Sequence, residues 1–244
     1  MNTIIIVQAR MTSTRLPGKV LKPILGKPLL EFEIERLKQV SLANQIVIAT
    51  TVNDADDQVI TLCNKMGVSF FRGSEDDVLS RYYLAAKKFK ADVVVRVTAD
   101  CPLIDFQVID QVIKKFISKP NEYDYGCNIL ERSFPRGLDV EVFSFSLLKN
   151  MFEVAKLPAE REHVTTYIHQ NINKYKVFNV KCEFGDMSSN RWTVDTEEDF
   201  KLIETILKNI YPQNKQFVLK DVLSLIEKNP EWNLINAHVE QKKL

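Results

Sequence analysis

The stretch that most constrains this chain lies at its N-terminus, where a short apolar run leads directly into a cationic loop. Residues 4–7 (Ile-Ile-Ile-Val) are typical of a buried strand. The loop carries Arg10, Arg15 and Lys19 and ends where the apolar spacing over residues 27–40 predicts a helix. In open α/β sheets, ligands bind beyond the carboxyl ends of the strands. Three crowded cations at that edge favour a polyanion such as a triphosphate as the ligand, and the alternative is a solvated basic surface loop.

Strand and helix patterns alternate along the rest of the first half. Further strands are predicted at 45–50, 68–71 and 92–97, and helices at 54–66, 75–89 and 106–117. This alternation predicts a doubly wound α/β fold, in which helices cover both faces of a mainly parallel sheet. The 92–97 run is almost wholly apolar and therefore indicates a central strand. Asp105 is the predicted cap of the helix that follows.

The second half has a less regular pattern. Strands are predicted at 123–128 and 138–143, separated by a long loop, and together they form an antiparallel excursion from the main sheet. The remaining predicted elements are helices at 144–155 and 159–170, a strand at 176–182, a helix that begins after Thr196, and a helix at 220–228. The last residues resemble a peripheral arm with a charged end.

Composition narrows the class of function. The 244 residues have a net charge of +1, so no global field favours nucleic acid or a membrane surface as a partner. Arg10 ends the first apolar run before it could serve as a signal segment, and no stretch approaches the roughly 20 apolar residues of a membrane span. The four cysteines are widely spaced, which is typical of reduced thiols in a cytoplasmic protein. The chain has no GxGxxG motif, which argues against a dinucleotide-binding dehydrogenase.

Two carboxylates follow predicted strands and precede predicted helices. Asp100 and Asp195 occupy this kind of position, so both side chains can converge on one cation at the sheet edge. The alternatives are a turn or cap role for Asp100, and a cap or an ion pair with Arg191 for Asp195. A D-x-D pattern at residues 54–56 also resembles a metal motif, but Asp54 as a helix N-cap is the preferred interpretation.

Six ordered blocks carry a resemblance to a known family. The blocks are ARxxSTRLPGK at 9–19, RGSEDDVLSR at 72–81, TADCPLID at 98–105, FPRGLDVE at 134–141, REHVT at 161–165 and RWTVDTEEDF at 191–200. They resemble the sugar-acid cytidylyltransferases, above all the branch of the spore coat polysaccharide protein, and are similar to 3-deoxy-manno-octulosonate cytidylyltransferase. The resemblance implies the nucleotide-diphospho-sugar transferase fold, a Rossmann-like arrangement. It also implies transfer of CMP from CTP to a sugar acid of the 2-keto-3-deoxy type, with release of pyrophosphate.

The resemblance also implies a role for each matching residue. The residues implied to be catalytic are Arg10, Arg15, Lys19 and Asp100. Nucleotide contacts are implied for Ala9, Arg10, Ser13, Thr14, Arg15, Lys19, Arg72, Gly73, Arg81 and Asp100. Acceptor contacts are implied for Arg136, Arg161, Glu162 and His163, and Mg²⁺ ligands for Asp100 and Asp195.

The expected organisation is one domain, residues 1–244. It comprises a nucleotide-binding half (1–120), a half for the acceptor and the dimer contact (121–205) and a C-terminal helical tail (206–244). A homodimer is expected through the antiparallel excursion, because Tyr125, Ile129, Leu130 and Phe134 would need cover.

Two other classes of function remain open. A metal-dependent glycosyltransferase would use an intact nucleotide sugar and release a nucleoside diphosphate. A non-catalytic subunit would bind CTP without consuming it. Cys101 stands beside Asp100, yet no general base is evident for it, so we expect its side chain only to pack.

Overall fold

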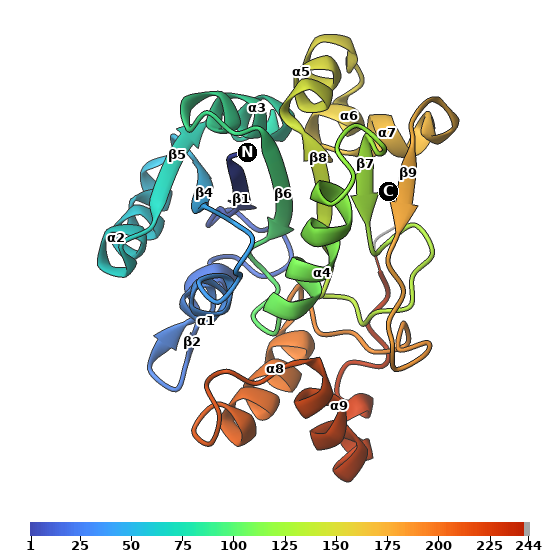
Figure 1. The fold of residues 1–244 in the computed structure, drawn as a ribbon. Coiled ribbons are helices and arrows are strands. Elements are labelled where there is room, and N and C mark those ends of the chain that lie inside the picture. The colour runs from blue at the N-terminus through green and yellow to red at the C-terminus, as the bar shows by residue number, and fades with distance from the viewer. Residues whose placement is uncertain (242–244) are drawn as a thin grey trace.

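The structure, a computed structural model, describes residues 1–241. Within that range one seven-stranded sheet has the order β5-β4-β1-β6-β8-β7-β9 (Figure 1). Its strands are β1 (Thr3–Gln8), β4 (Gln45–Thr51), β5 (Ser69–Gly73), β6 (Val93–Thr98), β7 (Tyr125–Cys127), β8 (Glu141–Ser144) and β9 (Val177–Asn179). Strands β5, β4, β1 and β6 are parallel, β8 pairs antiparallel with both β6 and β7, and β9 is parallel to β7. The predicted mainly parallel sheet, its central strand and its antiparallel excursion are therefore confirmed.

Helices cover both faces of the sheet. The α-helices are α1 (Leu29–Leu37), α2 (Asp57–Met66), α3 (Val78–Lys88), α4 (Phe106–Ile117), α5 (Phe145–Val154), α6 (Pro158–Glu162), α7 (Thr166–Gln170), α8 (Glu197–Ile210) and α9 (Leu219–Lys228). Short elements are the 3-10 turns η1 (Lys19–Leu21), η2 (Asp54–Asp56), η3 (Ile172–Lys174) and η4 (Pro230–Leu234), and the small hairpin of β2 (Pro23–Ile24) and β3 (Lys27–Pro28).

Alternate side chains of β1 enter two separate cores. Ile5 and Val7 belong to the larger core with α1, α2, α4, α8 and α9, whereas Ile4 and Ile6 belong to the core under α3 and α5. Figure 1 shows α8 and α9 together on one side of the molecule, in orange and red, and α3 and α5 at the opposite end. Because β1 is fully buried on both faces, it reads in sequence as a continuous apolar run.

Several predicted helices begin or end a few residues away from the bounds in the structure, and two of these differences have a clear physical cause. The helix expected from residue 75 begins at Val78, because the Asp77 carboxylate accepts the backbone N–H of Ser80 and caps the helix there. The helix expected at 159–170 is two short helices, α6 and α7. The break between them buries Val164 completely in the core under α3 and α5, which a continuous polar-faced helix would not do.

Two expectations for the second half of the chain are corrected. Tyr125 and Phe134 are 0% and 2% exposed within the single chain, so they need no partner to cover them, and Leu130 is 37% exposed. The C-terminal segment is not simply peripheral, because Asn236 is only 4% exposed. The last part of the charged end predicted for this tail, residues 242–244, lies outside the described residues.

Candidate active site

A cavity of about 230 Å³ lies at the carboxyl ends of β1 and β6. The loop after β1, the loop after β6, the end of α6 and the segment before α8 all contribute to it. Its lining residues are Gln8, Arg10, Ser13, Thr14, Arg15, Lys19, Val20, Thr98, Ala99, Asp100, Glu162, His163 and Asp195. Nine of the residues singled out in the sequence thus meet in one place, although they come from four distant segments.

The cationic loop has an ordered backbone path. The Gly18 N–H donates to the Met11 carbonyl at 2.8 Å, and Gly18 has a φ of 71°, a left-handed conformation that glycine adopts without strain. The Met11 N–H in turn donates to the Asp56 carboxylate at 2.7 Å. This closed loop turns Lys19 inward, so that the residue is only 8% exposed.

The Lys19 ammonium joins the two carboxylates. Its Nζ lies 2.8 Å from Asp100 Oδ2, 2.9 Å from Asp195 Oδ1 and 2.7 Å from the Val194 carbonyl oxygen. Burial by itself would lower the pKa of Lys19, but the charges of Asp100 and Asp195 raise it above its ordinary value. Burial likewise opposes ionisation of Asp100, yet Lys19 brings the pKa of that carboxyl down to about 2. Lys19 and Asp100 are therefore both charged at neutral pH.

Two arginines also bind Asp195. Arg15 Nη2 and Arg191 Nη2 each lie 2.9 Å from Asp195 Oδ2. Arg15 is partly exposed and lines the cavity, whereas Arg191 is buried. The predicted ion pair of Asp195 with Arg191 therefore exists alongside the predicted approach to Asp100.

The residues behind Asp100 hold its carboxylate in place. Thr98 Oγ1 donates to Asp100 Oδ1 at 2.7 Å, and the Cys101 Sγ lies 3.4 Å from the same oxygen. Burial raises the pKa of the Cys101 thiol well above its ordinary value, so the sulfur stays protonated. The Cys101 N–H donates to the carboxyl of Glu33, a completely buried group whose pKa burial also raises.

The fit of this site to Mg²⁺ follows from its donors. Among residues 1–241, no group of three or more His, Cys, Asp or Glu side chains forms a complete ligand set. Asp100 and Asp195 nevertheless share one cation, the Lys19 ammonium, which is the arrangement that two carboxylates around a small ion require. Mg²⁺ is usually held by one or two carboxylates plus water and phosphate oxygens. The donor set therefore fits Mg²⁺, provided that Lys19 yields its place.

A smaller cavity of about 150 Å³ adjoins the same strand ends. It is lined by Gln8, Ala9, Arg10, Val78, Arg81, Glu162 and His163. Arg81 is 1% exposed and its Nη1 donates to the Ser74 carbonyl at 2.8 Å. Gly73 lies against Arg81, since a Cβ at Gly73 would meet the Arg81 Cγ at 3.2 Å. The predicted nucleotide residues Ala9, Gly73 and Arg81 thus gather at or beside this second space.

Three predicted site arginines do not line either cavity. Arg72 donates from Nε to the Thr51 carbonyl at 2.9 Å and from Nη1 to Asp57 at 2.8 Å, so it joins β5 to the neighbouring segments. Arg161 binds Asp77 and holds α6 against α3. Arg136 pairs through its backbone with residue 191.

The contacts of the two aspartates in the D-x-D pattern show their role in the fold. Asp54 lies inside η2 and is not its N-cap, which is Asn53. Asp56 is 1% exposed and its Oδ2 accepts hydrogen bonds from Thr50 and Thr51. The Asp56 carboxylate therefore joins the end of β4 to the loop after β1, because it also accepts the Met11 N–H.

Four residues of the larger cavity were not among the predicted site residues: Gln8, Val20, Thr98 and Ala99. Gln8 and Thr98 are the final residues of β1 and β6 and stand opposite each other in the parallel pair. Only their position in the sequence could have indicated them, because the last residue of a parallel strand lies at the edge of the sheet where ligands bind.

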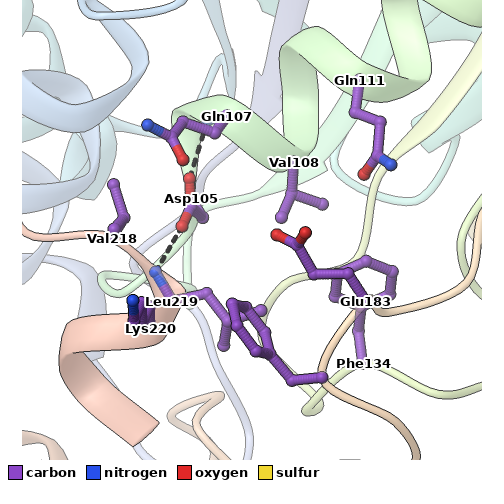
Figure 2. A pocket seen from close by; sticks show the side chains of 10 residues that line it. Asp105, Gln107, Val108, Gln111, Phe134, Glu183, Val218, Leu219 and Lys220 are labelled. Atoms are coloured by element: carbon purple, nitrogen blue, oxygen red, sulfur yellow. Dashed lines mark hydrogen bonds between the residues drawn. The ribbon is translucent and has the colours of Figure 1, made fainter. Parts of the chain in front are cut away.

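Another cavity, of about 240 Å³, lies between the starts of α4 and α9. Figure 2 shows the Asp105 carboxylate bonded to the backbone N–H groups at the starts of both helices, those of Gln107 and Leu219. This confirms Asp105 as the cap of α4. The Asp105 carboxylate is thus used for helix capping, so the charged cavity beside β1 and β6 is the candidate active site.

A Rossmann-like sheet with a cationic loop and two converging carboxylates at its carboxyl edge is the arrangement expected of a nucleotidyltransferase. Residues 4–224 match the family described as cytidylyltransferase, and the chain belongs to that family. The resemblance found in the sequence is therefore confirmed.

Individual relatives resemble this chain over nearly its whole length. The chain is 38% identical to an uncharacterised protein of Methanocaldococcus jannaschii over 243 residues, which cover 99% of this chain and 97% of that protein. It is 33% identical to the spore coat polysaccharide biosynthesis protein SpsF of Bacillus subtilis, over 95% of this chain and 97% of that protein. The solved structure of a cytidylyltransferase from Leptospira borgpetersenii is 36% identical and superposes with a TM-score of 0.92 over 100% of both chains. No helix within residues 1–241 is long and apolar enough to cross a membrane.

Proposed function

We propose that this chain transfers CMP from CTP to a sugar acid of the 2-keto-3-deoxy type, with release of pyrophosphate, in the synthesis of a surface polysaccharide precursor. The observation that carries the proposal is the meeting of Asp100 and Asp195 on one cation beside the loop that bears Arg10 and Arg15. Such a site has anionic groups for a divalent metal and cationic groups for a triphosphate. The name of the spore coat relative supports a role in polysaccharide synthesis, and the motifs shared with the 3-deoxy-manno-octulosonate enzymes support the choice of acceptor.

The loop cations would bind the triphosphate. Arg10 and Arg15 line the cavity with partly exposed side chains, and Lys19 would exchange its carboxylate partners for phosphate oxygens when CTP enters. Their charge would stabilise the pyrophosphate as it leaves. The base would occupy the smaller cavity, where Arg81 and the backbone beside Gly73 are within reach.

Asp100 and Asp195 would hold Mg²⁺, which supplies positive charge at the α-phosphate and lowers the pKa of the attacking hydroxyl. Thr98 fixes the orientation of the Asp100 carboxylate, and Arg191 that of Asp195. Glu162 and His163 line both cavities and so stand where an acceptor would approach the nucleotide. Arg161 is assigned a supporting role, because its guanidinium binds Asp77, whereas Arg136 remains an acceptor candidate, because its bridge to Arg191 is made by backbone atoms.

A pyrophosphate-release assay tests this function. CTP, UTP, GTP and ATP are each offered with a panel of sugar acids, with Mg²⁺ and with excess EDTA, and we expect release with CTP, a sugar acid and Mg²⁺ together. Asp100→Asn and Asp195→Asn should each lower the rate at least about a hundredfold, and the double variant by much less than the product, because both act on one ion. Release of a nucleoside diphosphate from a nucleotide sugar would instead indicate a glycosyltransferase. Binding of CTP without turnover would indicate a non-catalytic subunit.

We also propose a homodimer and a cytoplasmic location. The four cysteines are free and buried, which supports a reducing compartment. Light scattering should give twice the chain mass of 28.2 kDa, and a concentration-independent monomer would contradict the dimer.

A further inference from the structure

Arg191 is bonded to two carboxylates at once. Its Nη2 donates to Asp195 Oδ2 at 2.9 Å, while Nε and Nη2 donate to Asp199 at 2.9 and 3.0 Å. Arg191 is 8% exposed and Asp199 is completely buried. Asp199 therefore balances the charge of Arg191, and Asp195 keeps its negative charge for cations that enter the cavity.

Asp199 also fixes the backbone on which Asp195 stands. Its Oδ2 accepts the N–H of Asp195 at 3.0 Å and that of Thr196 at 3.2 Å. The position of the Asp195 side chain thus depends on the Asp199 carboxylate in two ways, through the backbone and through Arg191.

The C-terminal segment completes this network. The Asn236 side chain donates from Nδ2 to Asp199 Oδ1 at 2.9 Å and to the Arg191 carbonyl oxygen at 2.9 Å. Gln241 Oε1 accepts from Arg191 Nη1 at 2.6 Å. Asn236 is 4% exposed, so its amide makes these two bonds where water does not replace them.

We propose that Asn236 and Gln241 are positioning residues of the active site, which aim the Asp195 carboxylate by holding the Arg191–Asp199 pair. The inference rests on the proposed role of Asp195 in the transfer reaction. Without Asn236, Asp199 Oδ1 keeps a bond only from Arg191, and the buried Arg191 carbonyl loses its side-chain donor. The guanidinium can then tilt between its two carboxylates. A misplacement of about 1 Å at a reacting centre can cost about a hundredfold in rate.

Asn236→Ala tests the proposal, with Asn209→Ala as its matched control. Asn209 lies exposed on α8 and its amide donates only to the Thr205 carbonyl of the same helix, at 2.8 Å. We expect Asn236→Ala to lower kcat about tenfold with little change in the KM for CTP, and to raise the Mn²⁺ concentration needed for half-maximal rate. Added to Asp195→Asn, the substitution should cause no further loss, because it acts through that carboxylate.

Hydrogen exchange measures the positioning without substrate or metal. The N–H groups of Asp195 and Thr196, which both donate to Asp199, should exchange at least about tenfold faster in Asn236→Ala and unchanged in Asn209→Ala. If Asn236→Ala does not fold, Gln241→Ala removes a single bond at the surface and should shift exchange and kcat in the same direction to a smaller extent.

The outcomes separate this proposal from the proposed function. Unchanged exchange and unchanged kcat in Asn236→Ala would overturn it, as would a loss that adds in full to that of Asp195→Asn. If the unmodified enzyme releases no pyrophosphate with any acceptor, the proposed function fails. The exchange rates of Asp195 and Thr196 still decide whether the C-terminal segment positions this loop.

Discussion

Replacing Lys19 by Met should strengthen metal binding while it weakens catalysis. The Lys19 ammonium stands between Asp100 and Asp195, at 2.8 and 2.9 Å, in the place where the proposed metal ion would bind. A divalent ion must therefore displace it. Met keeps most of the side-chain volume and removes the charge.

The size of the effect follows from the pKa of Asp100. Lys19 outweighs the opposing effect of burial and brings that pKa from the ordinary 3.8 to about 2. One pH unit corresponds to about 1.36 kcal/mol, so the ionised carboxyl is stabilised by at least about 2 kcal/mol. A metal ion that no longer displaces the ammonium gains this amount, which is about 30-fold in affinity.

The assay is a titration of nucleotide-free protein with Mn²⁺, followed by electron paramagnetic resonance. Lys22→Met is the control, because Lys22 is a nearby cation that pairs with Glu197 at the surface and does not touch the carboxylates. Lys19→Met should bind Mn²⁺ about 30-fold more tightly than the unmodified protein and than Lys22→Met. Its kcat/KM should fall by a factor that corresponds to about 2–4 kcal/mol of lost transition-state stabilisation, because the triphosphate loses one cationic hydrogen-bond donor. Equal Mn²⁺ affinity in all three proteins would refute the reasoning.

The effect of the same substitution on the stability of the protein depends on pH. Asp100 has a lowered pKa in the folded protein, so its stabilising contribution is present above the ordinary carboxyl pKa near 4 and is lost as the pH falls through about 2. Lys19→Met should therefore be less stable by about 2 kcal/mol at neutral pH in metal-free buffer, and the difference should shrink below pH 4.

Three further substitutions test other parts of the site. Cys101→Ser should keep at least about a tenth of the turnover, because the thiol is buried and protonated, and a loss of several orders of magnitude in a folded variant would contradict this. Burial raises the pKa of Glu33, so this carboxyl stays neutral in the folded protein at a pH where it is ionised in the unfolded chain. The free energy of unfolding therefore falls as the pH rises above about 4.5. Glu33→Gln should remove that loss, so its stability relative to the unmodified protein, measured by urea unfolding, should increase from pH 5 to pH 8. Gly137→Ala should lower the stability by about 1–3 kcal/mol or more, because a Cβ there would lie 2.6 Å from the Trp192 backbone. Gly185→Ala, which meets open space, should cost less in the same thermal unfolding assay.

Local patterns were sufficient to predict most elements of the fold. Continuous apolar runs placed the central strands, because those strands are buried on both faces, and apolar repeats of about 3.6 residues placed the long helices, because burial of one helix face imposes that period. The same reasoning placed the Arg10–Lys19 loop and Asp100 at one edge, since each follows a strand of the same sheet. The strand predicted before Asp195 was wrong: that segment makes only an isolated bridge at Arg191, and Asp195 reaches the edge because the Val194 N–H donates to the Asp100 carbonyl. The break at His163 escaped this reasoning, because it depends on which core Val164 enters.

The partners of the charged side chains were decided by the tertiary structure. The sequence by itself determined that Arg72, Arg161 and Lys19 lie near strand ends or helix starts, but each of these cations takes the carboxylate or carbonyl group that packing brings within reach. Packing placed Arg72 on Asp57 and Arg161 on Asp77, away from the cavity, and placed Lys19 between the two candidate metal ligands.

The C-terminal segment shows the same limit. Nothing in the residues around position 236 signals an active-site role, because Asn236 meets Asp199, which lies 37 positions earlier, only after the chain has folded back. Periodicity reports which face of an element is buried. Hydrogen-bond and ion-pair partners depend on distances between elements, and those distances exist only in the packed protein.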